Sequence, residues 1–253
     1  MDFFSITLRK VETVADRTHA FFFSKPDGFT FLAGQYAMLR IPADRLVEQD
    51  VRSGMRPLSI ASAPSEAELA FVMREGMTGF KKTMWDLKIG EEISVSSPLG
   101  NATIPDGDVR PIAILSGGVG MAPARSMLLE AVSRNDARKF VLFSSNRFMK
   151  DIPFQGLLKT IKLPDFTYVF TLSAESAPAT LAGEERGRIS AEMIERYLPE
   201  WREALYYVIG APGFADAMKA LLLGIGIAPE NIHIDPFAGL TSGPQAVEVA
   251  KTS

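Results

Sequence analysis

A glycine-rich stretch in the middle of the chain has the residue types of a phosphate-binding turn. Residues 114–128 read ILSGGVGMAPARSML, in which a strand-like apolar run passes through Gly117, Gly118 and Gly120 into a helix-like segment. The glycines allow the backbone to turn tightly, and Pro123 can occupy the first helical turn, where its missing N–H costs nothing. The exposed amides of that turn would attract a pyrophosphate. A plain strand-to-helix turn needs glycine equally, so this stretch alone predicts either a phosphate site or an ordinary turn.

The next apolar run is followed by polar residues of a particular kind. A dinucleotide site of the glycine-fingerprint type normally has an Asp or Glu about 20 residues after the glycines, bonded to the ribose hydroxyls. Here the run KFVLF ends in Ser144, Ser145, Asn146 and Arg147, with no carboxylate. Hydroxyls followed by an arginine suit a 2′-phosphate, because a guanidinium makes paired hydrogen bonds to phosphate oxygens. A solvated loop arginine is the alternative interpretation of Arg147.

A third glycine-containing turn follows the apolar run YYVI. Gly210, Pro212 and Gly213 lie there, directly before another helix-like segment. Small residues at this point would let a flat ring lie over the edge of a sheet, although a turn requirement explains the glycines equally well.

The first half of the chain contains two further anion-binding patterns. In RPLSIASAP, Arg56 lies close to Ser59 in an otherwise small and apolar segment; facing a groove it would bind phosphate, and facing water it would be an ordinary surface charge. In MREGMTGFKK, Arg74 is followed by Thr78 and Gly79, which open a predicted helix whose N-terminal amides could hold a second phosphate. Together with the glycine-rich turn, these patterns indicate two nucleotides, as in a flavin that faces a nicotinamide.

The order of predicted elements divides the chain into two domains. The first hundred residues read as short strands separated by turns, which predicts an antiparallel barrel or sandwich. From Pro111 onward, apolar strands alternate with amphipathic helices, which predicts a parallel sheet covered on both faces. Its ligands would bind beyond the carboxyl ends of the strands, where the three turns described above come together. The change of pattern near NATIPDGDVRPI predicts domains at residues 1–106 and 107–253. Helices are expected in TGFKKTMWDLKIG, from about Ala122, near FQGLLKTI, and in SAEMIERYLPEW and GFADAMKALLLGIG.

Composition excludes several classes of function. The 253 residues include no cysteine, which rules out disulfides, thiolate-bound iron–sulfur clusters and a cysteine nucleophile, so redox chemistry requires a bound organic cofactor. A net charge of −3 gives no basic footprint for nucleic acid. His19 and His233 have no metal-ligand spacing, so no metal site is expected. We expect no membrane span and no signal peptide, and therefore a cytoplasmic protein.

Taken together, the motifs resemble those of the ferredoxin-NADP+ reductase family, in particular its compact members without a fused iron–sulfur domain. RPLSIASAP is similar to the family's flavin motif RxYS, TGFKK to its pyrophosphate turn SxFK, and SPLG to its GPxG. GGVGMAP is similar to GGxGxxP, SSNR to the loop around the adenosine ribose, and IGAPGF to CGPxxM near the nicotinamide. The resemblance extends over residues 33–240 and implies a flavin-binding barrel followed by a nicotinamide-nucleotide domain.

The resemblance also implies roles for individual residues. Arg56 would bind flavin phosphate, and Ser59 would approach the N5 edge of the flavin ring as the residue with a direct catalytic role. Asp235 is a candidate proton donor near the flavin, with a capping or surface carboxylate as the alternative. The implied cofactor-binding positions are Arg56, Pro57, Leu58, Ser59, Met73, Arg74, Thr78, Gly79, Phe80, Gly117, Gly118, Gly120, Met121, Pro123, Ser145, Asn146, Arg147, Gly210, Ala211, Pro212 and Phe237.

Three places depart from the family pattern. The family's C-terminal FxGY reads Phe237, Ala238, Gly239 and Leu240, so Phe237 would either lie over the flavin or close the core. Leu58 replaces the tyrosine that usually packs on the flavin, and Ile209 stands where the family often has a cysteine close to the nicotinamide. Ring stacking would become aliphatic packing, and hydride transfer would be slower or differently tuned.

The expected reaction is hydride transfer from NADPH or NADH to FAD, followed by electron delivery to ferredoxin, flavodoxin or another acceptor. The alternatives are an NAD(P)H:flavin reductase that releases its flavin, and a flavin-binding electron-transfer or sensory subunit that acts only when docked to a partner. Arg74 with the TGFKK turn favours a retained FAD, since it offers a second contact to the cofactor beyond the first phosphate. We expect a monomer or a weak dimer.

Overall fold

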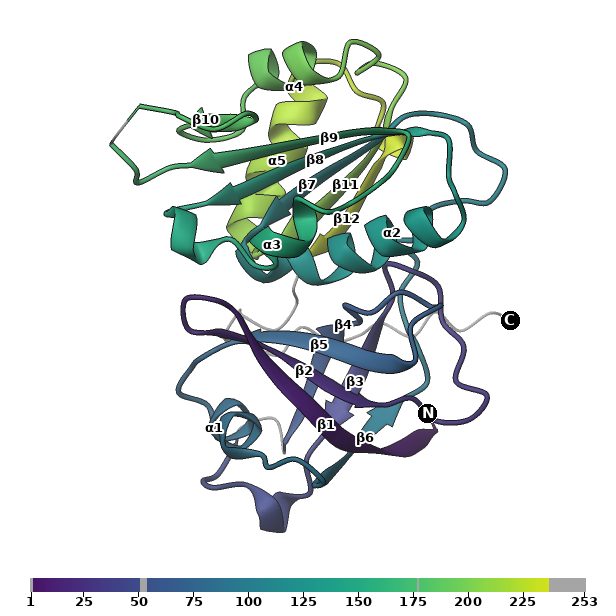
Figure 1. Ribbon diagram of the computed structural model, residues 1–253, viewed down its shortest axis with the longest axis vertical. Coiled ribbons are helices and arrows are strands. Elements are labelled where there is room, and N and C mark those ends of the chain that lie inside the picture. The colour runs from purple at the N-terminus through teal and green to yellow at the C-terminus, as the bar shows by residue number, and fades with distance from the viewer. Residues whose placement is uncertain (1, 51–53, 177, 237–253) are drawn as a thin grey trace, which may run out of the picture.

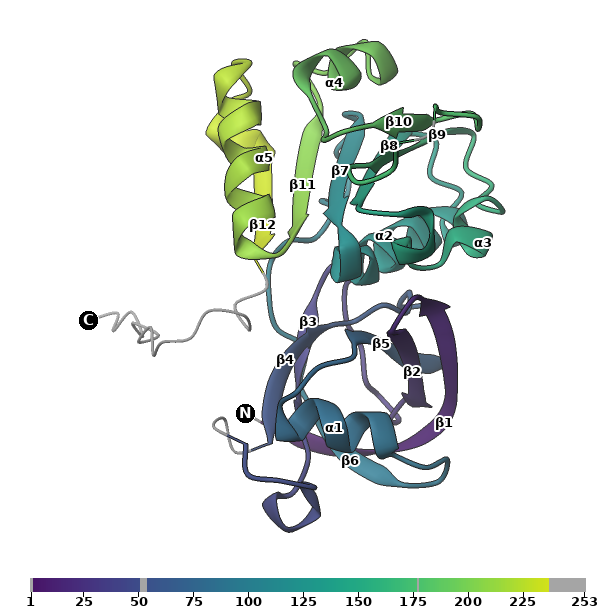
Figure 2. The ribbon, with the colours of Figure 1, turned by 90° about the vertical axis from the view of Figure 1, so that its left-hand side faces the viewer.

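The computed structural model describes residues 2–50, 54–176 and 178–236. Two sheets lie one above the other along the long axis of the molecule, with the N-terminal sheet at the bottom of Figure 1 and the C-terminal sheet at the top. Helices flank the upper sheet on both sides (Figure 2). No helix in the described part of the chain is long and apolar enough to cross a bilayer.

The first half of the chain folds into an antiparallel barrel. Its strands, within the described residues, are β1 (Phe3–Ala15), β2 (Thr18–Ser24), β3 (Tyr36–Arg40), β4 (Met55–Ser59), β5 (Glu68–Arg74) and β6 (Glu92–Ser96). They form one sheet in the order β4-β3-β6-β1-β2-β5. A bridge between Ile60 and Phe71, and a 2.7 Å hydrogen bond from the Ala61 N–H to the Ala70 carbonyl, join the two edges of that sheet. Of the barrel and the sandwich that the strand spacing predicted, the structure shows the barrel.

The apolar run AFFF in β2 is buried on both faces of the strand. Phe21 and Phe23 point into the barrel core. Ala20 and Phe22 point outward into a second apolar cluster that also contains Met127 from the C-terminal half. Because this cluster spans both halves of the chain, the barrel packs against the second domain through a continuous apolar interface.

The predicted helix around Trp85 is confirmed as α1 (Gly79–Asp86). Thr78 is its N-cap, and its hydroxyl accepts a hydrogen bond from the Lys81 N–H at 3.3 Å. The ring of Trp85 stacks on His19 of β2 with centroids 3.9 Å apart, which helps to hold the helix against the barrel.

The second half contains a parallel sheet in the order β10-β9-β8-β7-β11-β12. The strands of this sheet within the described residues are β7 (Ile112–Gly117), β8 (Lys139–Asn146), β9 (Asp165–Leu172), β10 (Glu184–Arg186), β11 (Leu205–Gly210) and β12 (Ile232–Pro236). The helices are α2 (Met121–Ser133), α3 (Gln155–Leu158), α4 (Ala191–Tyr197) and α5 (Pro212–Gly224). The short edge strand β10 was not predicted from the sequence.

Alternation along the strands explains why helices cover both faces of this sheet. Ile112 and Ile114 of β7 lie in one cluster with residues of α2 and α3. Ala113 and Leu115, on the opposite face, lie in another cluster with residues of α4 and α5. The predicted doubly covered parallel sheet is confirmed (Figure 2).

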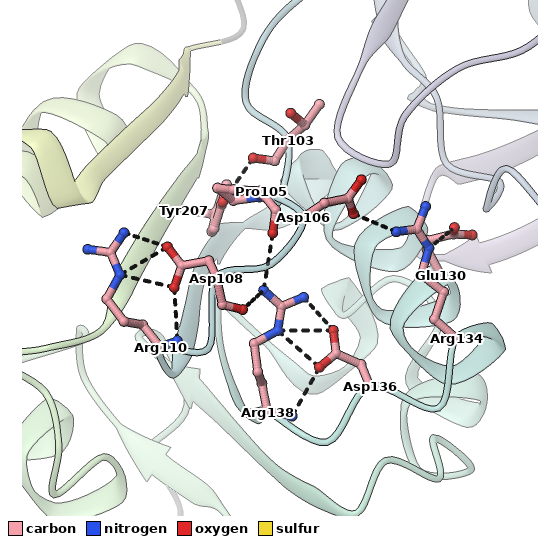
Figure 3. A network of polar contacts seen from close by, with 10 residues as sticks. All are labelled: Thr103, Pro105, Asp106, Asp108, Arg110, Glu130, Arg134, Asp136, Arg138 and Tyr207. Atoms are coloured by element: carbon pink, nitrogen blue, oxygen red, sulfur yellow. Dashed lines mark hydrogen bonds and ion pairs between the residues drawn. The ribbon is translucent and has the colours of Figure 1, made fainter.

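A network of ion pairs holds the segment that connects the two domains (Figure 3). Arg110 pairs with Asp108 at 2.6 Å. The hydrogen bonds from the side chain and backbone of Arg110 lower the pKa of Asp108 to about 2. Arg138 pairs with Asp136 and donates to the Asp108 carbonyl at 3.0 Å. Because β6 ends at Ser96 and β7 begins at Ile112, the predicted boundary between residues 106 and 107 falls within this connection.

Candidate cofactor-binding and active site

Two of the three turns predicted to bind a nicotinamide nucleotide line one cavity, and the Gly210 turn is not among its lining residues. The cavity has a volume of about 220 Å³ and lies at the carboxyl ends of β7, β8 and β9. Gly118, Ser145, Asn146 and Arg147 line it, together with Arg74 from the end of β5 in the barrel. The parallel register, in which Gly117 lies opposite Ser145, brings these segments together.

The side chain of Asn146 leaves one hydrogen-bonding atom available at this cavity. Its amide donates to the Ser144 hydroxyl at 2.9 Å. Its carbonyl oxygen is buried and has no partner within the described residues. A buried acceptor without a partner is costly unless a ligand satisfies it, and a ribose hydroxyl is a donor of the right kind.

The charges around the cavity suit an anion. Within the described residues, neither Arg74 nor Arg147 has a carboxylate within ion-pairing distance, and both are exposed. Two carboxylates, Asp16 and Asp151, also line the cavity. Asp16 pairs with Lys150 at 2.8 Å, which lowers the pKa of this carboxyl, and Asp151 accepts from the Phe148 N–H at 3.2 Å. Both carboxylates are therefore engaged, and the two guanidinium groups remain for a phosphate.

The glycines of the central turn are required by different neighbours. A Cβ on Gly120 would lie 2.3 Å from the Ile209 carbonyl oxygen, so the end of β11 leaves no room for a side chain. Gly118 has φ of +54° and open space around it, so its backbone can approach a ligand. Pro123 is the third residue of α2 and is buried, in agreement with the predicted place in the first helical turn.

A residue that sequence reasoning missed lies over two of these turns. The ring of Phe214 in α5 would be 3.0 Å from a Cβ on Gly117 and 2.7 Å from one on Gly210. Because Gly117 and Gly210 have no side chains, the ring of Phe214 fits against both of them. The flat ring that the sequence predicted at the Gly210 turn was that of a bound ligand. The sequence held no signal for this, because Phe214 fits the apolar pattern of its helix. Ala211 and Pro212 are, respectively, the N-cap and the first residue of that helix.

The flavin-phosphate residues predicted in the barrel form an anion-binding site. Arg56 lies on β4, and its Nη2 is 2.7 Å from the Oδ2 of Asp50, whose side chain has no exposed surface. The Phe80 N–H, at the N-terminus of α1, donates to the same oxygen at 2.9 Å. These groups fit an oxyanion, because a carboxylate already occupies the position that a phosphate would take. Asp50 was not among the predicted site residues.

Two further cations surround this site. The ammonium of Lys81 donates to the Arg74 carbonyl at 3.0 Å. Burial, with the nearby charges of Arg56 and Arg74, lowers the pKa of Lys81. Lys82, the next residue, pairs with Glu48 at 2.8 Å.

A contact between the two domains lies at the predicted catalytic position. The hydroxyl of Ser59, at the end of β4, donates to Oδ2 of Asp235 in β12 at 3.3 Å. Burial raises the pKa of Asp235. Asp235 pairs in register with Ile209 of β11, so the position of the family's cysteine, the carboxyl group and Ser59 lie close together. Phe237 lies outside the described residues.

Several predicted site residues have buried side chains, so only their backbones can reach a ligand. Met73 and Phe80 lie in the barrel core, and Met121 lies in the interdomain cluster. Leu58 packs against the barrel core, and Pro57 lies between Arg56 and Leu58 on β4. The predictions for these positions as cofactor contacts stay predictions.

The antiparallel barrel followed by a doubly covered parallel sheet is the two-domain fold that the resemblance implied, and solved reductase structures share it. Residues 114–220 match the family model of the oxidoreductase NAD-binding domain. With the similar proteins described below, this match supports the resemblance to the ferredoxin-NADP+ reductase family.

Several known proteins with similar sequence or structure are named as reductases, and flavohemoproteins are also among the similar proteins. The reductase component of propane 2-monooxygenase from Rhodococcus jostii is 29% identical over 219 residues, covering 84% of this chain and 57% of the relative. An Amycolatopsis cytochrome P450 reductase superposes with a TM-score of 0.78 at 23% identity, covering 93% of this chain and 70% of that one. A ferredoxin NADP+ reductase from Neisseria gonorrhoeae, solved with bound FAD and NADP, gives a TM-score of 0.77 at 18% identity, with coverage of 93% and 99%. The chain spans less than two thirds of the length of the first curated relatives that it matches.

Proposed function

We propose that this chain is an NAD(P)H-dependent flavoprotein reductase. The observation that carries the proposal is the contact between Ser59 and Asp235. This contact joins β4, which bears the proposed flavin-phosphate ligand Arg56, to β12. β12 lies beside β11, in which Ile209 directly precedes the Gly210 turn. The flavin, when bound, supplies hydride acceptance and onward electron donation.

The protein's own residues bind, orient and supply a proton. Arg56 and the first amides of α1 hold the flavin phosphate, and Arg147 holds a phosphate of the nicotinamide nucleotide. Arg74, predicted from the sequence as a second contact for FAD, lines the cavity beside Arg147, and we assign it to the nicotinamide nucleotide instead. Asp235 retains its proton to higher pH than an ordinary carboxyl and can exchange it with the Ser59 hydroxyl. The apolar interface between the domains keeps these two sets of residues in a fixed relation.

We propose a protein electron carrier, such as a ferredoxin, a flavodoxin or an oxygenase component, as the acceptor. The similar proteins, which include the reductase component of an oxygenase, support this class of partner. Lys81 and Lys82 are engaged within the protein, so they do not form an open basic rim for such a carrier.

The experiment that tests the function uses the purified full chain. We expect a yellow protein, or one that binds added flavin with quenched fluorescence, and we expect NADPH or NADH to bleach the flavin absorbance under anaerobic conditions. If flavin binds but neither nucleotide bleaches it, the chain is a dependent electron-transfer subunit and not an autonomous reductase. If no flavin binds, the proposed function is wrong.

A second candidate is an NAD(P)H:flavin reductase that takes flavin as a substrate. The observation that favours it is the carboxylate of Asp50 in the flavin-phosphate site, because a phosphate must compete with it. Colourless protein whose NAD(P)H oxidation saturates with added flavin would support this candidate over a retained cofactor.

Replacing Arg147 by alanine is expected to raise the KM for NADPH about 10- to 100-fold, because a charge-assisted phosphate contact contributes about 1.5–3 kcal/mol. The KM for NADH, which has no 2′-phosphate, should change by less than about twofold. Steady-state kinetics with both nucleotides checks this. Arg202→Ala, an exposed arginine before β11 at the opposite end of the sheet, is the control and should leave both constants unchanged. Equal changes for the two nucleotides in the Arg147 variant would contradict the 2′-phosphate role.

Replacing Asp235 by asparagine is expected to slow flavin reduction about tenfold or more, as removal of a general acid does. In the wild-type protein the rate should fall as pH rises through the raised pKa of Asp235, because the carboxyl loses its proton there. The asparagine variant should lose that limb of the pH profile. Stopped-flow reduction from about pH 4, close to the pKa of an unperturbed aspartate, up to about pH 9 measures both effects. The same pH limb in the variant would assign it to another group.

A further inference from the structure

A short segment of the barrel domain is docked on the N-terminal half of α1. The Val47 N–H donates to the Thr83 hydroxyl at 3.0 Å, and Glu48 pairs with Lys82 at 2.8 Å. The backbone passes so close to the start of the helix that a Cβ on Gly79 would lie 2.5 Å from the Glu48 carbonyl oxygen. Residues 47–50 therefore cover the helix N-terminus at the place where a phosphate would approach.

The segment delivers a carboxylate to the anion-binding groups. Asp50 receives hydrogen bonds from the Arg56 guanidinium at 2.7 Å and from the Phe80 N–H at 2.9 Å, and its side chain is fully buried. These are the two kinds of donor that a phosphate uses at such a site, a guanidinium and a helix-terminal amide. The positive charge that Arg56, Arg74 and Lys81 concentrate here is thus partly neutralised by the chain itself.

We propose that Asp50 is an internal competitor for the flavin phosphate and thereby sets the affinity of the protein for phosphorylated flavins. The proposal rests on the proposed function, in which Arg56 and α1 bind that phosphate. A carboxylate and a phosphate cannot share the same two donors, because their charges repel and only one of them fits against the amide. Phosphate binding therefore requires residues 47–50 to leave α1. The apparent dissociation constant of a phosphorylated flavin is then its intrinsic value divided by the fraction of molecules in which these residues have left.

The competition predicts a difference between flavins. FMN and FAD carry phosphate and must displace Asp50, whereas riboflavin carries none and leaves the contact with Arg56 in place. Weakening the internal contact should therefore strengthen the binding of FMN and FAD and leave the binding of riboflavin unchanged.

The test is a fluorescence titration of flavin-free full-length protein with FAD, FMN and riboflavin at constant ionic strength. Asp50→Asn keeps the size of the side chain and removes its charge. We expect FAD and FMN to bind about tenfold more tightly to this variant, because its side chain no longer makes a charge-assisted hydrogen bond that the phosphate must displace. Riboflavin affinity should stay within about twofold. Asp44→Asn removes the same charge from an exposed position on the same connection and is the matched control, with no expected change.

A second variant leaves Asp50 intact. Thr83→Val removes the hydroxyl that accepts the Val47 N–H and should also tighten FAD and FMN binding, because residues 47–50 are held less firmly. Melting curves of each variant show that the fold is kept. Unchanged or weaker FAD and FMN binding in both variants, with wild-type protein that binds flavin, would overturn the competition and leave the proposed function standing. Failure of wild-type protein and all variants to bind any of the three flavins would overturn both.

Discussion

Replacing Arg125 by methionine is expected to lower the free energy of unfolding by about 3 kcal/mol, the lower end of the range for breaking a buried ion pair. Arg125 lies on α2 and is nearly buried, with a side chain 8% exposed. It donates to the Ala61 carbonyl at 2.7 Å and to both carboxylate oxygens of Glu66 at 2.8 and 2.9 Å. Methionine has a similar length but no donor, so the buried Ala61 carbonyl loses this hydrogen bond, while the partly exposed Glu66 can be hydrated.

The same change should slow the transfer of electrons from nicotinamide nucleotide to flavin. Arg125 connects the helix that follows the glycine turn to the segment that follows Ser59, so it holds the two proposed cofactor sites in register. We expect the rate of flavin reduction to fall about tenfold, because small displacements of reacting groups are costly, while flavin affinity stays near the wild-type value.

Urea denaturation and stopped-flow reduction measure the two effects. Arg134→Met is the matched control: Arg134 is the C-cap of α2, its side chain is 52% exposed, and it pairs with the exposed Asp106 and with the more buried Glu130. Exposed pairs contribute about 0–1 kcal/mol, so this control should change little. Equal losses in the two variants would contradict the special role of Arg125 at the domain interface.

Replacing Gly120 by alanine is expected to destabilise the protein by about 3 kcal/mol or more, at the upper end of the range for overpacking. The added Cβ would lie 2.3 Å from the Ile209 carbonyl oxygen and 2.9 Å from its carbon. Both atoms are backbone of a buried strand, so they cannot rotate away as a side chain could. The turn and the end of β11 would have to separate, which would also weaken binding of the nicotinamide nucleotide.

Thermal denaturation and an NADPH titration measure these losses. Gly224→Ala provides the control, since it is the last residue of α5 and an added Cβ there would meet no neighbouring part of the protein within 4 Å. A helical Gly→Ala change favours the helix by up to about 1 kcal/mol. If Gly120→Ala were as stable as this control, the close approach of β11 would not be the reason for glycine in the turn.

The sequence by itself determined the fold class and most of the elements. The alternating and continuous apolar runs predicted the antiparallel and parallel sheets, because strands buried on one face and on two faces have different periodicities. The glycines, Pro123 and Arg147 indicated the nucleotide turn, because their requirements are local: backbone freedom, a helix start and a charge after a strand. The lack of cysteine similarly limited the chemistry to a bound cofactor.

Only the tertiary structure decided which of these residues meet and what else meets them. Arg74 joins Arg147 across the domain interface, Ser59 contacts Asp235, and Phe214 lies over Gly117 and Gly210. Asp50 pairs with Arg56 at the proposed phosphate site although its surroundings in the sequence resemble an ordinary polar loop. Such contacts depend on how strands distant in sequence are ordered and how two domains pack, and no local pattern of residues encodes that arrangement.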